Sequence, residues 1–339
     1  MLRVYKNYTP LNEDLKLISS MLPFKQNSLF LAPMEGVTDA LYRQLILEEF
    51  NDWDIAACDF LRIPSGGTYP EKHLLKHFGQ QHYQNDERKK KTIYQIMSAL
   101  SSKTAETVEQ LSSLGFKWVD LNLGCPSKTV CKRKAGSSLL EHPEEMRPML
   151  RTIRKNYPHF FSVKMRIGFD DDKNFEYCLK LFEDEGVDAI TIHGRTRAQL
   201  YKGVANWDYI RTAVKTVKVP IIGNGDIWNV EDIDRIFDYT GCHSAMMARG
   251  ALKTPWLAYL YKNKLKDSLE MRAEMIPLYF SKYENILTPY TTSQFRLRRY
   301  KGLSRYLFDD FPKALNIRSR LLRSQSLEQF QEILSEPLL

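Results

Sequence analysis

Eight short apolar, β-branched runs alternate with stretches of helical period between residues 28 and 250 of the chain. The apolar runs are Ser28–Ala32, Trp53–Cys58, Thr92–Met97, Trp118–Leu123, Phe160–Met165, Asp188–Ile192, Val219–Gly223 and Ser244–Ala248. The helical patterns between them include Asp39–Glu49, Thr104–Leu114, Pro143–Asn156, Asn174–Glu185, Trp207–Thr216 and Val230–Tyr239. Parallel strands need long crossovers, usually helices, so this alternation indicates parallel pairing. Eight units over about 230 residues predict an α/β fold, the (β/α)8 TIM barrel.

An open, doubly wound sheet is the rival architecture. It requires a glycine-rich nucleotide-binding turn after its first strand, but Pro33 and Met34 follow the first apolar run here. The segment Gly223–Trp228 has the first two glycines of a GxGxxG pattern and lies after the seventh run. We interpret it as a strand-end turn, which favours the barrel.

The apolar runs stop at about residue 265, and the rest of the chain has helical period. Tyr300, Leu303 and Leu307 form one apolar stripe at helical spacing. A small all-α helical domain is therefore expected after the barrel. The predicted organisation is an N-terminal extension at 1–27, a catalytic barrel at 28–264 and a helical domain at 265–339.

The basic charge of the chain is concentrated in two segments. The net charge is +8 and the pI about 9.0, while residues 291–323 alone hold nine Lys/Arg against two acidic residues, a net charge of +7. Within them Arg298, Lys301 and Arg305 lie nearly opposite the apolar stripe. The second segment, Lys128–Lys134, has no acidic residue. A solvated face is the simpler reading, but solvated faces usually mix signs, so we expect phosphate contacts.

The cysteines and the polarity of the chain indicate its compartment. Five cysteines are scattered, and Cys125 and Cys131 fit neither a zinc knuckle nor a CxxC pair. This usage is typical of a reducing compartment. The first 28 residues carry Glu13 and Asp14 where a signal peptide is apolar, and no run of about 18 apolar residues occurs. We expect a cytoplasmic monomer without a membrane segment or a stable protein partner.

A metal site is the next alternative, because His73 and His77 stand four residues apart with His82 nearby. The glutamate of an HExxH pattern is absent, and no carboxylates complete a ligand set. Two histidines on a surface helix are the preferred interpretation, and no metal is expected.

Polar residues follow each apolar run, at the strand ends where barrel enzymes carry their chemistry. They are Glu35, Asp59, Gln95, Asn122 with Cys125, Lys164 with Arg166, His193, Asn224 to Asp226, and Arg249. Singly, a histidine after a strand or a buried thiol has a structural explanation. Their coincidence on one rim favours an active site. The segments Gly223–Asp226 and Ala248–Gly250 follow strands seven and eight, where barrels commonly bind a phosphate.

Several longer motifs occur in a fixed order. They are LAPMEGVTD at Leu31–Asp39, LNLGCPSK at Leu121–Lys128, VKMRIG at Val163–Gly168 and IHGRT at Ile192–Thr196, followed by Asn224–Asp226 and Arg249–Gly250. With them the chain strongly resembles the flavin-dependent tRNA-dihydrouridine synthases from about Leu29 to the C-terminal helices. Glu35, Asn224–Trp228 and the basic C-terminal helix resemble the bacterial C-type enzymes most.

The resemblance implies an FMN across the barrel mouth, reduced by NADPH or a related nicotinamide cofactor. The implied FMN-binding residues are Pro33, Met34, Glu35, Gln95, Lys164, His193, Asn224, Gly225, Asp226, Ala248 and Arg249. A cation such as Lys164 stabilises the charge of a reduced flavin near N1 and C2, and Arg249 can neutralise the phosphate. Ala248 stands where the family commonly has glycine.

The resemblance also implies the reaction, reduction of the C5=C6 bond of a tRNA uridine, with U16 of the D loop suggested by the C-type likeness. Cys125 matches the general acid of the family. An unperturbed thiol with a pKa of about 8.5 is mostly protonated at neutral pH, so it can donate a proton. The target base must leave its stack to reach the flavin. The implied tRNA-binding residues are Arg62, Asn122, Arg166, Arg298, Arg299, Lys301 and Arg305.

Three alternatives remain open at this point. An FMN barrel acting on a free pyrimidine shares the cofactor and the reaction but gives no reason for the basic helix. A catalytically silent tRNA-binding protein gives no reason for Cys125, Lys164 and His193. Cys131 replaces Cys125 as the acid only if the loop Ser127–Ser138, which has fewer glycines than expected, is rearranged.

Overall fold

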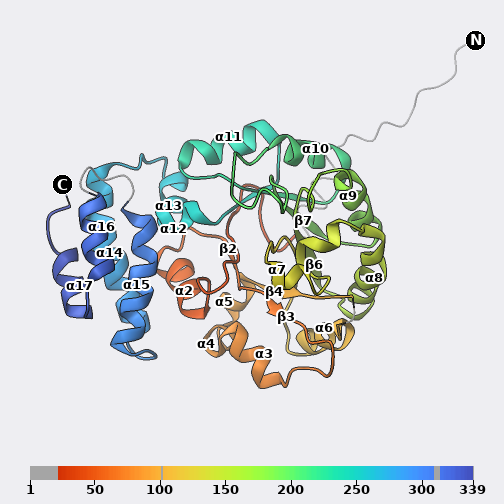
Figure 1. Ribbon diagram of the computed structural model, residues 1–339, viewed down its shortest axis with the longest axis horizontal. Coiled ribbons are helices and arrows are strands. Elements are labelled where there is room, and N and C mark those ends of the chain that lie inside the picture. The colour runs from red at the N-terminus through yellow and green to blue at the C-terminus, as the bar shows by residue number, and fades with distance from the viewer. Residues whose placement is uncertain (1–21, 101, 309–313, 339) are drawn as a thin grey trace, which may run out of the picture.

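The computed structural model describes residues 22–100, 102–308 and 314–338 (Figure 1). A closed barrel of parallel strands occupies one side of the molecule, and helices near the C-terminus form a separate group beside it. The predicted (β/α)8 barrel followed by C-terminal helices is confirmed.

Eight parallel strands close the barrel, because β1 pairs with both β2 and β9, and β2 pairs with β4. They are β1 (Leu29–Leu31), β2 (Ile55–Ala57), β4 (Thr92–Met97), β5 (Trp118–Leu123), β6 (Phe160–Arg166), β7 (Ala189–His193), β8 (Ile221–Asn224) and β9 (Ser244–Met247). Each lies within or close to one of the predicted apolar runs. All their residues are buried except two on β6, as expected for strands covered on both faces.

One short strand, β3 (Leu61–Arg62), has no counterpart among the predicted runs. It pairs in parallel with the end of β4, Leu61 opposite Ile96 and Arg62 opposite Met97. Two residues are too few to show a periodicity, so the sequence pattern does not reveal this strand. Its effect is to hold Arg62 at the carboxyl rim of the barrel.

The crossovers between the strands are mostly helical. They contain α2 (Ala40–Gln44), the π-helical turn η1 (Leu45–Glu49), α3 (Glu71–Phe78), α4 (Gln80–Gln84), α5 (Asp86–Lys90), α6 (Thr104–Ser113), α7 (Lys128–Cys131), the 3₁₀ turns η2 (Gly136–Leu140) and η3 (Pro143–Met146), α8 (Arg147–Asn156), α9 (Phe175–Asp184), α10 (Asp208–Thr216) and α11 (Val230–Thr240). After β9 come α12 (Arg249–Lys253) and α13 (Leu257–Lys262). Local signals set their ends: on α11, Asn229 accepts from the N–H of Asp232 and Gly241 ends the helix in the left-handed region at φ 70°.

Aromatic rings fill the amino end of the barrel. Phe24 stacks on Trp118 with ring centroids 5.1 Å apart and meets Phe30 edge to face at 5.2 Å. Phe24 precedes residue 28, where the barrel is predicted to begin, yet it packs with the inward-facing side chains of the strands. A plugged amino end leaves the carboxyl rim as the open end of the barrel.

The C-terminal helices are α14 (Leu269–Leu287), α15 (Ser293–Leu307), α16 (Ala314–Arg323) and α17 (Leu327–Leu334). They pack on the barrel next to α2 and α12 (Figure 1). Tyr283 of α14 meets Tyr42 of α2 edge to face at 5.9 Å. The apolar stripe Tyr300, Leu303 and Leu307 of α15 is buried, as its spacing predicts. The division at residues 264 and 265 into two domains stays a prediction.

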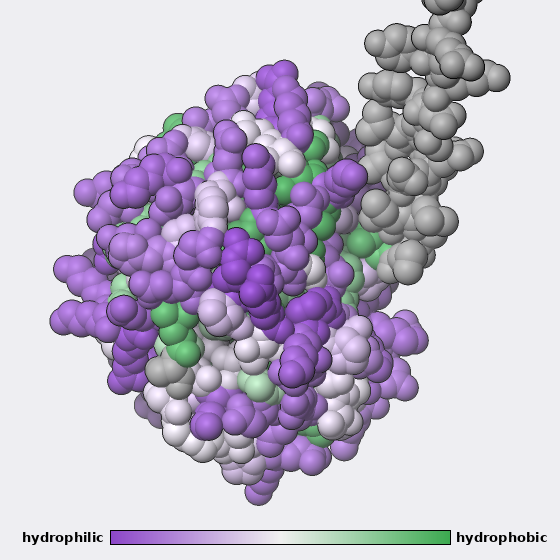
Figure 2. Space-filling view, turned by 90° about the vertical axis from the view of Figure 1, so that its right-hand side faces the viewer, coloured by the Kyte–Doolittle hydropathy of each residue, from purple (hydrophilic) through white to green (hydrophobic). Residues whose placement is uncertain are grey.

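The surface on the side away from the C-terminal helices is mostly hydrophilic, with residues of intermediate hydropathy and some apolar residues among them (Figure 2). Among the described residues, no helix is both long and apolar enough to cross a membrane.

Candidate active site

A cavity of about 530 Å³ opens at the carboxyl ends of the strands. Most of the rim residues predicted from the strand ends line it: Pro33, Met34, Glu35, Asn122, Cys125, Lys164, Arg166, His193, Asn224, Gly225, Asp226, Ala248 and Arg249. Tyr306 of α15 lines it as well, so the C-terminal helices contribute to its wall. The volume lies in the range of roughly 300–1,000 Å³ that is usual for cofactor and ligand sites.

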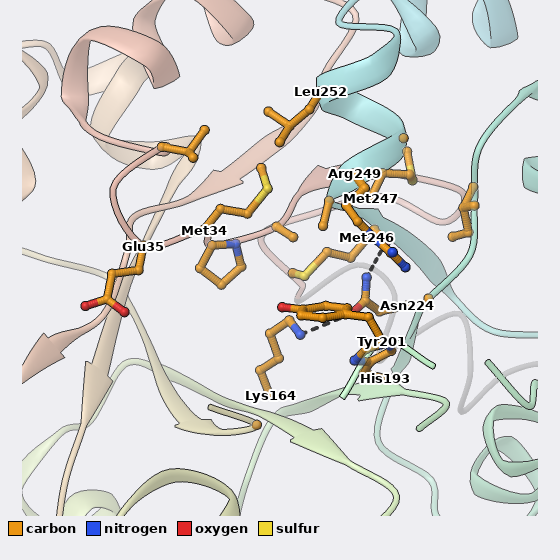
Figure 3. Close-up of a pocket in the computed structure, with 18 of the residues that line it drawn as sticks. Met34, Glu35, Lys164, His193, Tyr201, Asn224, Met246, Met247, Arg249 and Leu252 are labelled. Carbon is orange, nitrogen blue, oxygen red and sulfur yellow. Dashed lines mark hydrogen bonds between the residues drawn. The ribbon is translucent and has the colours of Figure 1, made fainter. Parts of the chain in front are cut away.

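One side of the cavity is polar. Lys164 of β6 donates to Oδ1 of Asn224 at 3.1 Å, and Nδ2 of Asn224 donates to the carbonyl of Met246 at 2.6 Å (Figure 3). Burial, with the charge of Arg166, lowers the pKa of Lys164 to about 8, while Asp120 opposes the shift. Lys164 is therefore largely cationic at neutral pH.

His193 lies on the same side, at the end of β7. Burial, together with the charges of Lys164 and Arg166, holds its pKa well below the usual value. The imidazole is therefore neutral at pH 7, so it can donate or accept a hydrogen bond but does not add charge. The next strand end passes very close: a Cβ on Gly225, whose φ is +116°, would stand 2.8 Å from the ring of His193.

Met34, Met246, Met247 and Leu252 form the opposite, apolar side (Figure 3). Methionine side chains are flexible and polarisable, and they pack well against flat aromatic groups. Glu35 points away from the polar group around Lys164 in this view. The cavity thus offers one polar and one apolar wall to a ligand.

Two arginines and one carboxylate are joined at the mouth. Asp226 accepts a bidentate pair from Arg195 at 3.0 and 2.6 Å, and a third bond from Arg249 at 3.1 Å. Burial alone would raise the pKa of Asp226, but the hydrogen bonds and charge of Arg195 and Arg249 lower it below its usual range. Asp226 is therefore ionised and fixes Arg249 at the cavity edge.

Two aromatic rings complete the support of Arg249. Its guanidinium carbon stands 5.0 Å from the ring centroid of Tyr201 and 4.8 Å from that of Trp228. Cations are attracted to the faces of aromatic rings at these distances. Arg249 is still 32% exposed in its side chain, so it remains accessible to an anion.

The turn that follows β8 and the start of α12 lie so close to each other that no side chain fits between them at Gly250. A Cβ on Gly250 would stand 2.1 Å from the carbonyl oxygen of Ile227. The backbone N–H groups of this first turn have no partners within the helix. Arg249 belongs to the same turn, so its guanidinium and these N–H groups together suit an anion.

Replacement of Gly250 by alanine is therefore expected to destabilise the protein. Overpacking of this kind typically lowers the free energy of unfolding by about 1–3 kcal/mol. Gly302 on α15 is the matched control, since a Cβ there meets nothing within 4 Å, and alanine in a helix should stabilise by roughly 0.5–1 kcal/mol. Urea denaturation measures both variants. Equal stability of the two variants would contradict the close approach.

Cys125 stands at the start of the loop after β5 and lines the cavity. Its backbone carbonyl accepts from the hydroxyl of Ser137 at 2.7 Å, and its N–H donates to Oδ1 of Asn122 at 2.9 Å. Burial raises the pKa of the Cys125 thiol, and the nearby Glu35 adds to the shift. The thiol is therefore protonated at neutral pH and is suited to donate a proton.

The loop after Cys125 folds beneath it without the extra glycines. It forms α7 and then η2; Lys134, at φ 49°, lies between them, and Gly136, at φ 61°, begins η2. Sγ of Cys131 lies 3.9 Å from the carbonyl oxygen of Cys125. Cys131 is not among the residues that line the cavity, so the geometry favours Cys125 as the acid.

Gln95 and Arg299 are among the expected site residues that do not line the cavity. Gln95 is fully buried below the cavity, where its amide bonds to Asp120 at 2.8 Å and to Asn122 at 2.9 Å. Arg299 lies at the junction of α15 with the barrel: it donates to the carbonyls of Gly36, at 2.6 Å, and Val37. Its side chain is 11% exposed. In the structure Gln95 is thus buried, and Arg299 joins the C-terminal helices to the loop that follows Met34 and Glu35. Their expected roles in binding FMN and tRNA stay predictions.

The basic face of α15 behaves differently. Arg298 and Arg305 are exposed and Lys301 is half-buried, and within the described part of the chain they make no ion pair. Arg62 lies near Cys125, and its positive charge opposes the rise in the pKa of that thiol. Arg166 donates to the carbonyls of Gly124 and Leu200 at 3.0 and 2.9 Å, which ties together two loops of the rim.

The site also contains residues that the sequence reasoning did not select. They include Val37, Phe60, Tyr201, Trp228, Leu252 and Tyr306, whereas Asp59, which also lines the cavity, was expected at the end of the second strand. Tyr201 and Trp228 follow the motifs around His193 and Asn224, so their position after a strand end was a usable signal. Tyr306 had no such signal, because its contribution depends on how α15 docks.

The histidines considered for a metal have separate partners. His77 is hydrogen-bonded to the carbonyl of Asp59 at 2.9 Å, His73 stacks on Tyr69 at 4.1 Å, and His82 is buried. In the described ranges there is no group of three or more residues suited to hold a metal ion.

Fold and site together define a barrel enzyme with a cofactor-sized cavity, a partly exposed arginine at its edge and a protonated thiol at its mouth. The family model described as Dihydrouridine synthase (Dus) matches residues 30–338. The chain therefore belongs to the dihydrouridine synthase family, a family of flavin-dependent oxidoreductases, and the resemblance found in its motifs is confirmed.

Curated relatives are similar over most of their length. The tRNA-dihydrouridine(16) synthase of Haemophilus influenzae is 31% identical over 319 residues, which cover 91% of this chain and 99% of that protein. The tRNA-dihydrouridine(16) synthase of Shewanella oneidensis is 34% identical over 68% of this chain and 73% of its own. The tRNA-dihydrouridine synthase B of Pasteurella multocida is 31% identical over 74% of each.

Proposed function

We propose that this protein reduces the C5=C6 bond of a uridine in the D loop of tRNA, at position 16, to dihydrouridine. The observation that carries the proposal is a protonated thiol, Cys125, in the same cavity as a cationic Lys164. Relatives named for modification at position 16 support the choice of substrate. The protein would work in the cytoplasm as a monomer.

The cavity has the chemistry that FMN needs. Its apolar wall of methionines suits a flat ring system, and Lys164 and Asn224 offer hydrogen bonds to the polar edge of a ring. Arg249 and the backbone N–H groups beside Gly250 suit a phosphate. When bound, FMN reduced by NADPH supplies the hydride for C6 of the uracil. Lys164 stabilises negative charge in that position, and neutral His193 contributes a hydrogen bond.

Asp226 should matter for FMN binding although it is itself an anion. Its role is to hold Arg249, so Asp226→Asn is expected to weaken FMN binding about tenfold, the loss of one well-placed hydrogen bond to a charged group. FMN retained after dialysis, followed by visible absorbance, measures the change. Asp171→Asn is the control, because its ion pair with Lys173 is exposed. Unchanged retention in Asp226→Asn would contradict this role.

Cys125 donates the proton that C5 requires after C6 has been reduced. The uracil must leave its stack to reach the cavity, as in other enzymes that modify bases. Asn122 and Arg166 line the cavity close to Cys125 and are placed to contact that base. Arg62 lies on the RNA side of the mouth.

The tRNA backbone would be held by the basic face of α15, residues Arg298, Lys301 and Arg305, with the segment Lys128–Lys134 as a second contact. Both segments flank the mouth, because α15 contributes Tyr306 to the cavity wall and Lys128 follows Cys125 by three residues. In this proposal residues 28–264 form the FMN-binding catalytic domain and residues 265–339 the tRNA-binding domain.

A comparison of substrates tests the function. The purified holoprotein, reduced with NADPH, is given unmodified tRNA, free uracil or orotate under anaerobic conditions, and reoxidation of its flavin is followed. We expect reoxidation with tRNA only. Reoxidation with a free pyrimidine but not with tRNA would favour a pyrimidine reductase, and a colourless protein that binds tRNA would favour a silent binding protein.

A further inference from the structure

A chain of hydrogen bonds runs beneath the cavity, inside the barrel, and ends at the proposed proton donor. Gln95 of β4, Asp120 of β5 and Ser162 of β6 are paired neighbours on adjacent strands. Asp120 and Asn122 are two residues apart, so both side chains point into the barrel. All four of these side chains are buried, and Asn122 alone of them lines the cavity.

The direction of each hydrogen bond in this chain is fixed by chemistry. The indole N–H of Trp118 can only donate, and it donates to Oγ of Ser162 at 2.9 Å. The hydroxyl proton of Ser162 is then given to Oδ1 of Asp120 at 2.6 Å. An ionised carboxylate accepts only, so Gln95 must present Nε2 to Oδ2 of Asp120, at 2.8 Å.

The orientation of Gln95 determines that of Asn122. With its Nε2 turned to Asp120, Gln95 presents Oε1 to Asn122, whose Nδ2 donates to it at 2.9 Å. Oδ1 of Asn122 is thereby left to accept from the backbone N–H of Gly124 at 3.0 Å and of Cys125 at 2.9 Å. Each amide has one orientation that satisfies both neighbours.

A carboxylate in this place is costly for folding. Burial raises the pKa of Asp120 to about 6, although its bonds to Ser162 and Gln95 and the charge of Lys164 oppose the shift. When folding raises a pKa, the folded state loses stability as the pH rises from the ordinary value, here 3.8, to the raised one, and the loss is complete above about pH 6. At pH 7 an uncharged side chain here would therefore cost less. Stability alone therefore does not explain the aspartate.

We propose that Asp120 is a positioning residue for the proton donor: its carboxylate sets the orientation of the Gln95 and Asn122 amides and so holds the backbone of Cys125. The inference rests on the proposed function of Cys125. It assigns to Asp120 and Gln95 a role in protonation although neither of them lines the cavity.

The decisive variant is Asp120→Asn. An amide at this position can keep its hydrogen bonds to Ser162 and Gln95 only if the amides of Gln95 and Asn122 reverse their orientation. The new amide keeps its oxygen toward Ser162 and turns its N–H to residue 95. Gln95 and then Asn122 must turn over, and Asn122 would finally place an N–H against the N–H of Cys125. Displacement of a reacting group by about 1 Å can cost roughly 100-fold, so we expect dihydrouridine formation to fall 10- to 100-fold.

The double variant Asp120→Asn with Gln95→Glu restores the directions. The amide at 120 then donates to one carboxylate oxygen at 95, and the other oxygen accepts from Asn122 as before. The negative charge is kept, but it moves from position 120 to position 95, the next member of the hydrogen-bonded chain. We expect this double variant to recover most of the lost rate, whereas Gln95→Glu alone places two carboxylates together and should be impaired.

The experiment measures single-turnover dihydrouridine formation by pre-reduced holoenzyme with saturating tRNA, flavin reduction by NADPH, and urea denaturation. Ser162→Ala is the matched control: it removes a buried hydrogen bond but leaves the direction at Gln95 unchanged. We expect Ser162→Ala to lose stability and keep its turnover rate, and Asp120→Asn to lose turnover with flavin reduction intact. Normal turnover in Asp120→Asn, with a loss of turnover in Ser162→Ala, would mean that Asp120 serves the fold alone and would overturn the inference.

Two further outcomes separate this inference from the proposed function. An impaired Cys125→Ala beside an unimpaired Asp120→Asn would overturn the inference and leave Cys125 as the donor. An Asp120→Asn that stays impaired when Gln95→Glu is added, with normal flavin reduction, would also overturn it. Full activity in Cys125→Ala would remove the proposed role of Cys125 as the proton donor, and the inference with it.

Discussion

Cys125→Ala should bind FMN and accept electrons from NADPH at the normal rate, yet make dihydrouridine about 100- to 10,000-fold more slowly, the usual contribution of a general acid. The physical reason is that the thiol lines the cavity and burial raises its pKa, so it holds a proton where the substrate must receive one. Single-turnover product formation and flavin reduction, measured on the same preparation, separate the two steps.

Cys131→Ala is the matched control for this prediction. Its thiol is directed to the backbone carbonyl of Cys125 and does not line the cavity. We expect product formation close to that of the wild type. A normal rate in Cys125→Ala, or an equal loss in both variants, would refute the assignment of the acid.

Reversal of charge at Arg298, Lys301 and Arg305 together should raise the KM for tRNA by about 100- to 1,000-fold, because each hydrogen bond from a charged group to a phosphate contributes roughly 1.5 kcal/mol. The slope of log affinity against log salt should fall by about 2 to 3 for three lost contacts. NADPH-dependent flavin reduction should not change. Filter binding of tRNA over a salt series measures both effects.

A matched reversal on the opposite side of the barrel controls for net charge. Lys155, Lys180 and Lys215 are exposed on and near α8, α9 and α10, away from α15 in Figure 1. Figure 2 shows that the side of the molecule away from the C-terminal helices is mostly hydrophilic. The same loss of tRNA affinity in both triple variants would mean that α15 has no special role and that its basic face is only solvated.

Local patterns were sufficient to predict the barrel and most of the rim. The strands are continuous apolar runs because both of their faces are buried, and strand ends of a parallel barrel converge on one rim. Lys164, His193 and Asn224 could therefore be assigned to one site without knowledge of any contact. The absence of a nucleotide-binding turn after Leu31 correctly excluded the open sheet.

The contacts of Gln95 and Arg299 could not be predicted, because they depend on how separate elements pack. Whether Gln95 reaches a ligand or a neighbour is decided by the acceptor that Asp120 presents from the next strand. Arg299 precedes Leu303 by four residues, so it belongs to the packed face of α15 and not to the exposed one. That spacing was visible in the sequence, but its partner, the loop at Gly36 and Val37, was not.

The central claim is that this chain forms dihydrouridine in the D loop of tRNA, and mapping of the modified base tests it most directly. Total tRNA from a bacterial strain that lacks its own dihydrouridine synthases is compared by mass spectrometry with and without expression of this protein. We predict dihydrouridine at position 16 with the wild-type protein and none with Cys125→Ala. Absence of dihydrouridine from all tRNA, with the protein folded and carrying flavin, would contradict the account.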